Sequence, residues 1–111
     1  ILCAPCDPDP HLRLALHHAR FGEVWEAKMH ADIAEKLQPT SAWVHDQIGR
    51  IYWAISGYQT AESSDWRKHS LAAFNEAARR DPAHFKPEIM SYLRFYGVEE
   101  AELEPYRNLV D

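Results

Sequence analysis

The sequence predicts an all-α protein, and three observations support this. Apolar residues recur every three or four positions through most of the chain, which is the spacing of one helical face. Proline, glycine or a short polar residue stands where these patterns start or stop. No stretch reads as a strand. A chain of 111 residues with 46% apolar and 26% charged residues suits one small globular domain.

The first half of the chain predicts three helices. They are expected over residues 10–21, about 23–37, and from a cap at Thr40 or Ser41 to about residue 56. Asp9 and Pro10 mark the first start, because an acidic cap and an N-terminal proline both favour a first turn. Gly22 suits the left-handed residue that ends the first helix, and Pro39 closes the second. The third helix carries the most regular apolar stripe, at Val44, Ile48, Ile51 and Ile55.

The second half predicts a polar loop and three more helical segments. The loop covers residues 58–64, and Ser64 or Asp65 then caps a helix over residues 66–80. Pro87 is expected to open a fifth helix, which ends near Tyr96 and Gly97. The last, acidic segment is expected to be helical, with Pro105 bending or breaking it.

Two segments of the chain share one pattern of small and apolar residues. The separations between Ala27, Ala31, Ala34 and Pro39 are the same as those between Ser70, Phe74, Ala77 and Pro82. The two prolines lie 43 residues apart. This distance equals a repeat of about 34 residues plus an insertion of about nine.

The pattern resembles the second helix of a tetratricopeptide repeat (TPR), whose motif is Ala-x3-Phe, a small residue, then Pro. The first-helix motif of that family, Trp-x2-Leu-Gly-x2-Tyr, is matched at His45, Ile48, Gly49 and Tyr52, and only the opening aromatic residue departs. A poorer copy is His11, Leu14, Ala15 and His18. The alternative is an irregular helical bundle in which these spacings arise by chance.

The resemblance implies a right-handed stack of antiparallel helix hairpins, a TPR-like α-α superhelix of about two and a half repeats with a C-terminal capping helix. Residues 1–8 would form an extended arm, residues 9–97 the helical domain with an insertion at about 58–66, and residues 98–111 an acidic cap. Ala15, Ala27 and Gly49 would let paired helices approach, while Tyr52 and Phe74 fill the space between them.

Members of the family bind peptide segments or partner proteins on the face formed by the first helix of each repeat. By position this implies a protein–protein interaction module, an adaptor or accessory subunit, with a concave face rich in arginine and aromatic residues. The partner-binding candidates are Arg13, Arg20, Trp43, Gln47, Arg50, Trp53, Lys86, Met90 and Tyr96. Such a face suits an acidic or aromatic segment of another protein, because arginine pairs with carboxylates and stacks on rings. The alternative is that the tryptophans are core residues and the arginines are merely solvated.

A second hypothesis is a metal-handling or redox accessory protein. Cys3 and Cys6 form a Cys-x-x-Cys pair that is a candidate local disulfide. The predicted helices place three histidines close together: His17, His18 and His30. On this hypothesis two of them meet across a helical hairpin and bind a soft or borderline metal. Plain surface histidines are the alternative, and no cofactor is expected.

Other classes of function are disfavoured. The net charge of −5 argues against a nucleic acid partner, and no apolar run approaches the roughly 18 residues that cross a membrane. No nucleophile stands beside a base and an orienting group, so an enzyme is not expected. The chain begins at Ile1, and cleavage of a secretory signal before it would explain this, which favours a periplasmic or secreted location over a cytoplasmic one.

Overall fold

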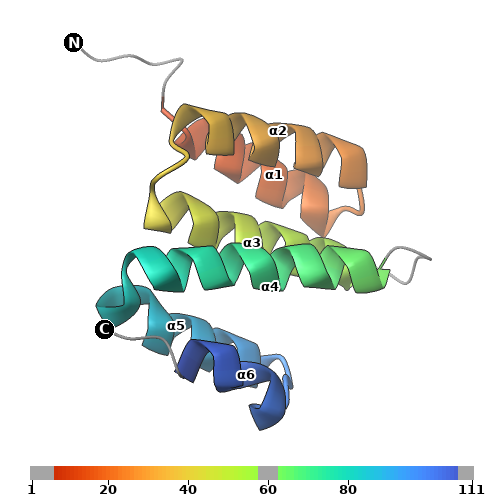
Figure 1. The fold of residues 1–111 in the computed structure, drawn as a ribbon. Helices are drawn as coiled ribbons and strands as arrows, with labels where there is room; N and C mark the ends of the chain where they lie inside the picture. Colours follow the sequence, from red (N-terminus) through yellow and green to blue (C-terminus); the bar gives the residue numbers. More distant parts are fainter. Residues whose placement is uncertain (1–6, 58–62, 108–111) are drawn as a thin grey trace.

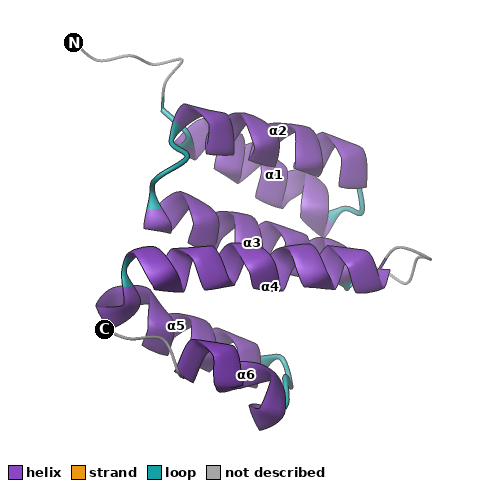
Figure 2. Cartoon of the chain, in the orientation of Figure 1, coloured by secondary structure: helices purple, strands orange, loops and turns teal. Residues whose placement is uncertain are grey.

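The computed structural model describes residues 7–57 and 63–107, and the regular structure in these ranges is all helical (Figure 2). Within these ranges six helices follow one another: α1 (Asp9–Arg20), α2 (Val24–Leu37), α3 (Ala42–Ser56), α4 (Ser63–Arg80), α5 (Pro82–Phe95) and α6 (Glu100–Arg107). The prediction of an all-α protein is confirmed. None of the described helices is long and apolar enough to span a membrane.

The helices pair as antiparallel hairpins α1/α2, α3/α4 and α5/α6, which lie one below another in chain order (Figure 1). Helices α2, α4 and α6 face the viewer, and α1, α3 and α5 lie behind them. The Cα atoms span 40 × 36 × 18 Å, so the protein is a slab two helices thick. It therefore has two broad faces, one formed by each set of helices.

Several predicted helix ends are confirmed. The Ser41 hydroxyl accepts a hydrogen bond from the backbone N–H of Val44 (3.2 Å), as expected of a capping residue. Gly22 and Gly97 have φ of 74° and 83°, the left-handed conformation that lets the chain leave α1 and α5.

The predicted start of α5 at Pro87 is wrong. The helix begins at Pro82, and the Asp81 carboxylate caps it by accepting a hydrogen bond from the backbone N–H of His84 (3.4 Å). The Asp81–Pro82 pair therefore ends α4 and starts α5 at once. Pro87 lies inside the helix.

Three smaller expectations are also corrected. Helix α4 begins at Ser63, so neither Ser64 nor Asp65 precedes it as a cap. Pro105 does not break α6, which continues to Arg107. The first helix begins at Asp9 rather than Pro10, and the Asp9 backbone N–H donates to Oδ1 of Asp7 (3.0 Å).

Small residues allow the closest helix contacts. Ala15, Ala19, Ala27 and Ala31 are fully buried between α1 and α2 and their neighbours. In the next hairpin, a Cβ atom at Gly49 of α3 would lie 2.6 Å from Cδ1 of Phe74 on α4. No real Cβ tolerates that distance, so the glycine is what permits the ring to pack there.

The third hairpin shares an apolar core with α4, because Phe74, Ala77 and Ala78 belong to the same cluster as its buried residues. Leu103 of α6 is fully buried, in one cluster with Phe85, Ile89 and Leu93 of α5. The C-terminal segment is helical, as expected, and α6 packs against α5.

Candidate functional site

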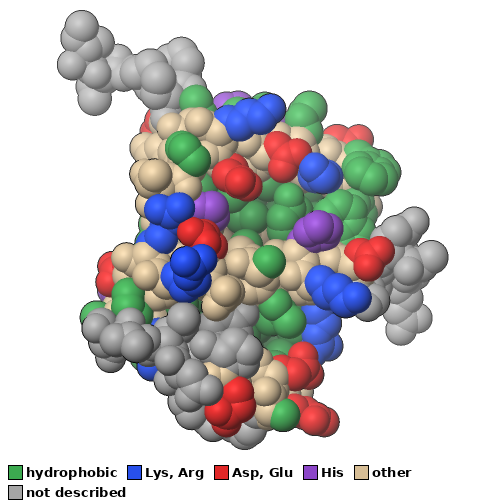
Figure 3. Space-filling view, viewed as in Figure 1, with side chains coloured by type: hydrophobic (Ala, Val, Ile, Leu, Met, Phe, Trp, Pro, Cys, Tyr) green, Lys and Arg blue, Asp and Glu red, His purple; other side chains and the backbone are tan. Residues whose placement is uncertain are grey.

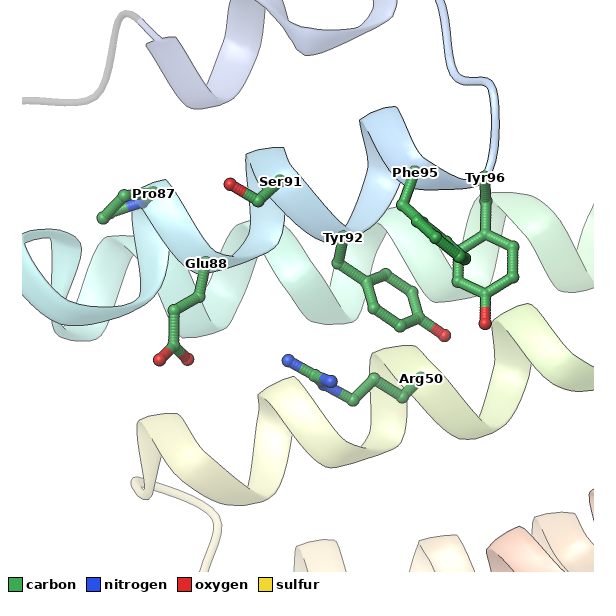
Figure 4. A pocket seen from close by; sticks show the side chains of 7 residues that line it. All are labelled: Arg50, Pro87, Glu88, Ser91, Tyr92, Phe95 and Tyr96. Atoms are coloured by element: carbon green, nitrogen blue, oxygen red, sulfur yellow. The ribbon is translucent and has the colours of Figure 1, made fainter.

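An open pocket of about 650 Å³ lies between α3 and α5, on the face formed by α1, α3 and α5. Figure 4 shows its lining residues: Arg50, Pro87, Glu88, Ser91, Tyr92, Phe95 and Tyr96. Arg50 comes from α3, and the others come from α5 and its C-terminal end. The residues on α5 recur every three or four positions, so one face of this helix supplies most of the pocket.

A buried carboxylate on the same helix, that of Asp46, holds the Arg50 side chain in place. Its Nε donates to Oδ2 of Asp46 at 3.1 Å, and the Asp46 side chain is only 3% exposed. Burial raises the pKa of Asp46, although the guanidinium beside it acts in the opposite direction. Oδ1 of Asp46 accepts no hydrogen bond from the described residues. Asp46 thus orients Arg50 through an ion pair with its Nε.

An aromatic row on α5 forms the opposite wall. The Arg50 guanidinium lies 4.7 Å from the centre of the Tyr92 ring, at cation–π distance. Burial raises the pKa of Tyr92 to about 12, so its hydroxyl stays protonated at neutral pH. Phe95 is 81% exposed and Tyr96 is 53% exposed. Exposed aromatic side chains beside an arginine are typical of interface hot spots.

Trp53 extends this wall toward α4. Its ring lies 6.4 Å from that of Tyr96, and the Arg67 guanidinium lies 5.0 Å from its centre. Three of the predicted binding residues, Arg50, Trp53 and Tyr96, are therefore brought together by the fold. Lys86 and Met90 instead line a smaller pocket of about 270 Å³ on α5.

The remaining predicted binding residues lie away from the α3–α5 pocket. The Arg13 side chain is 81% exposed and pairs with Asp9 at 2.8 Å. Arg20 is exposed in the last turn of α1. Trp43 is partly exposed in the first turn of α3, and Gln47 donates to Asp46 at 3.5 Å.

Two of the three predicted histidines, His18 and His30, meet across the α1/α2 hairpin, and His11 joins them. His30 of α2 stacks on His18 of α1, with ring centres 5.7 Å apart, and its Nδ1 lies 3.1 Å from Nδ1 of His11. His17 instead packs against Phe21. His11 was missed, although it lies seven residues before His18 and so shares a helical face with it.

The metal-binding hypothesis for these histidines stays a prediction. Over residues 7–57 and 63–107, no three His, Cys, Asp or Glu side chains are arranged to hold a metal ion. Cys3 and Cys6 lie outside the described residues, as do residues 58–62 of the predicted insertion and residues 108–111. The disulfide and the role of that loop therefore stay predictions.

The pocket residues that sequence reasoning missed are those on α5. Glu88, Ser91, Tyr92 and Phe95 were not among the partner-binding candidates, whereas Tyr96 was. The sequence does contain a signal for this site, because three aromatic residues lie within five positions, at Tyr92, Phe95 and Tyr96. That is more aromatic side chains than one turn of a small helix usually buries.

Comparison with known proteins adds no family: no family model, curated protein or solved structure matches this chain.

Proposed function

We propose that this protein is an interaction module that binds a peptide segment of a partner protein in the α3–α5 pocket. The observation that carries the proposal is the exposed aromatic row of α5 facing an arginine fixed by a buried carboxylate. Its mechanism is recognition, and the chain acts as an adaptor or accessory subunit.

The order of the helix pairs supports a TPR-like stack as the frame of this module. Helix α3 contacts α1 on one side and α5 on the other, as successive first helices of such repeats do. The close contact of Gly49 with Phe74 supplies the small-against-large packing that the resemblance implies. The α3–α5 pocket then lies on the face that family members use for binding.

The chemistry of the pocket favours a partner segment with an acidic side chain next to an aromatic or apolar one. Arg50 offers a planar guanidinium for a carboxylate, because Asp46 engages its Nε. Phe95 and Tyr96 offer apolar area that water now covers. Aromatic side chains contribute much of the binding energy in known interfaces.

A random peptide library displayed on phage tests this proposal. We expect the selected peptides to share an acidic and an aromatic or apolar position. Phe95→Ala is expected to raise their Kd about tenfold, because loss of an exposed hot-spot side chain costs about 1.4 kcal/mol or more. Fluorescence anisotropy with a labelled selected peptide measures the change.

The choice of variants matters, because Arg50→Glu would leave Asp46 buried beside a second carboxylate and destabilise the fold. Arg50→Lys keeps the charge and removes the planar guanidinium, so a weaker Kd for acidic peptides is expected. Arg79→Ala removes an exposed arginine of α4 and serves as the control. Selected peptides that bind Phe95→Ala and the parent protein equally well would contradict the proposal.

A further inference from the structure

A second groove, of about 370 Å³, lies between α2 and α4, with α3 as its floor. Figure 3 shows this hollow, with a hydrophobic floor and with acidic side chains and histidines at its edges. It is formed by α2, α3 and α4, whereas the α3–α5 pocket is lined by α3 and α5. The two sites share no lining residue. Ala72 and Ala73 line the groove on α4, and their short side chains leave the groove open.

Carboxylates outnumber cations along this groove. Asp32 and Glu35 line its α2 wall and Glu76 its α4 wall, with Lys28 the lysine among its lining residues. Lys28 pairs with Asp32 at 2.6 Å.

The Glu76 carboxylate pairs with Arg79 and Arg80, at 3.3 and 2.9 Å. Glu35, in contrast, forms no ion pair with another of the described residues. The α2 wall therefore presents an uncompensated negative charge.

Aromatic rings form the end of the groove nearest the start of α4. Tyr52 and Trp66 lie 5.6 Å apart and His69 lies 6.0 Å from Tyr52. The edge of Trp25 meets Trp66 at 6.0 Å. Burial raises the pKa of Tyr52, and the nearby carboxylates of Asp32 and Glu35 raise it further, as negative charge beside a hydroxyl does.

We propose that the α2–α4 groove is a second binding site, which takes a lysine or arginine side chain from a peptide segment of a partner protein. The long alkyl stem of such a side chain suits the apolar floor at Ile48 and the two alanines. Its charged end suits the carboxylates of α2, of which Glu35 forms no ion pair with another described residue. The site shares no lining residue with the α3–α5 pocket and binds a segment of opposite charge.

Nuclear magnetic resonance titration with defined peptides tests the proposal. The probes are blocked peptides Gly-Ser-Leu-Xaa-Leu-Ser-Gly in which Xaa is Lys, Arg, Gln or Glu. We expect the Lys and Arg peptides to shift the indole N–H signal of Trp66 and the ring signals of Tyr52 and His69 in a saturable way. The Gln and Glu peptides are expected to leave these signals in place.

Two matched variants of α2 separate a site from general attraction to an acidic protein. Glu35→Gln is expected to raise the Kd of the Lys and Arg peptides about three- to fivefold, the range of one exposed ion pair. Glu26→Gln removes the same charge from the same helix nine residues earlier, half a turn away around the axis, and is expected to change nothing. Phe95→Ala leaves the titration unchanged, so the result is separate from the function of the α3–α5 pocket.

Three results would overturn the proposal. One is an equal response to the Gln peptide, which would make the binding apolar. Another is an equal effect of Glu26→Gln and Glu35→Gln on the Kd, which would mean that the peptides respond to the net charge of the protein. The third is a shift of the Trp66 signal with protein concentration alone, which would make the occupant a second copy of this chain.

Discussion

At the scale of single residues, the contact between Gly49 and Phe74 sets how closely α3 and α4 approach. A methyl group at position 49 would lie 2.6 to 2.8 Å from three carbon atoms of the ring. Ser70 fixes the same contact from α4, because its buried hydroxyl donates to the carbonyl of Gly49 at 2.6 Å.

Gly49→Ala is therefore expected to lower the free energy of unfolding by about 1–3 kcal/mol, the usual cost of overpacking a core. Urea denaturation followed by circular dichroism measures it. Phe74→Leu removes the ring, so in the double variant Gly49→Ala should cost less than it does alone. A cost of Gly49→Ala that is the same with Phe74 and with Leu at position 74 would contradict this assignment.

At the scale of helices, the α1/α2 hairpin carries a stack of imidazole rings. His30 lies between His11 and His18, and each approaches it from α1. Burial lowers the pKa of His30, and the charges of His11 and His18 lower it further. The folded hairpin thus favours neutral His30.

The sign of the pH dependence follows from this direction. Unfolded His30 titrates near 6.5 and binds a proton more readily than folded His30, so its contribution is intact above that pH and is lost as the pH falls. Between pH 7.5 and 5.5 the parent protein should lose more of its free energy of unfolding than His30→Gln does. Urea denaturation at both pH values measures the difference.

His84→Gln, on the exposed surface of α5, is the control and should keep the dependence of the parent protein. If His30→Gln loses as much stability on acidification as the parent protein, the stack of imidazoles has no part in the pH response.

Helix existence was predictable from the sequence, and helix boundaries were less so. The apolar periodicity and the caps at Ser41, Gly22 and Gly97 act locally, so they can be read without tertiary structure. The start of α5 was missed because one Asp-Pro pair both ends a helix and begins the next. Pro87 lies inside α5 and Pro105 inside α6, so neither proline marks a helix start or end here.

The candidate site was predictable only in part. Arg50, Trp53 and Tyr96 were found because the resemblance assigns positions on the first helices of the repeats. The groove between α2 and α4 was not found, because it depends on how far apart two helices stand over a third. From the sequence alone, Asp32 and Glu35 are expected to lie on an ordinary solvated helix face. Their place in a groove follows only from the separation of α2 and α4.

At the scale of the whole molecule, α3 and α4 form the most extensive contact between helices, and α5/α6 the least extensive within a hairpin. Burial against both neighbours makes the centre of α3 the hardest part to open. Amides around Ile48 and Ile51 are therefore expected to exchange slowest with deuterium, and those of α6 fastest among the helices. Hydrogen exchange followed by mass spectrometry measures this order.

The pair of Arg67 with Glu102 joins α4 to α6 at 2.9 Å and offers a check on that order. Glu102→Gln should speed exchange in α6 and leave α3 unchanged. Hydrogen exchange in α3 that is as fast as in α6 would contradict the expectation that the α3/α4 hairpin is the most stable part of the protein.

Helix α3 supplies Arg50 to one binding surface and Ile48 and Tyr52 to the other. A ligand in one site that turns or shifts α3 must also move the α3 residues that line the other site. By thermodynamic reciprocity, each ligand then alters the affinity for its counterpart by an equal factor. Binding at either of the two proposed sites is therefore expected to depend on whether the other site is occupied.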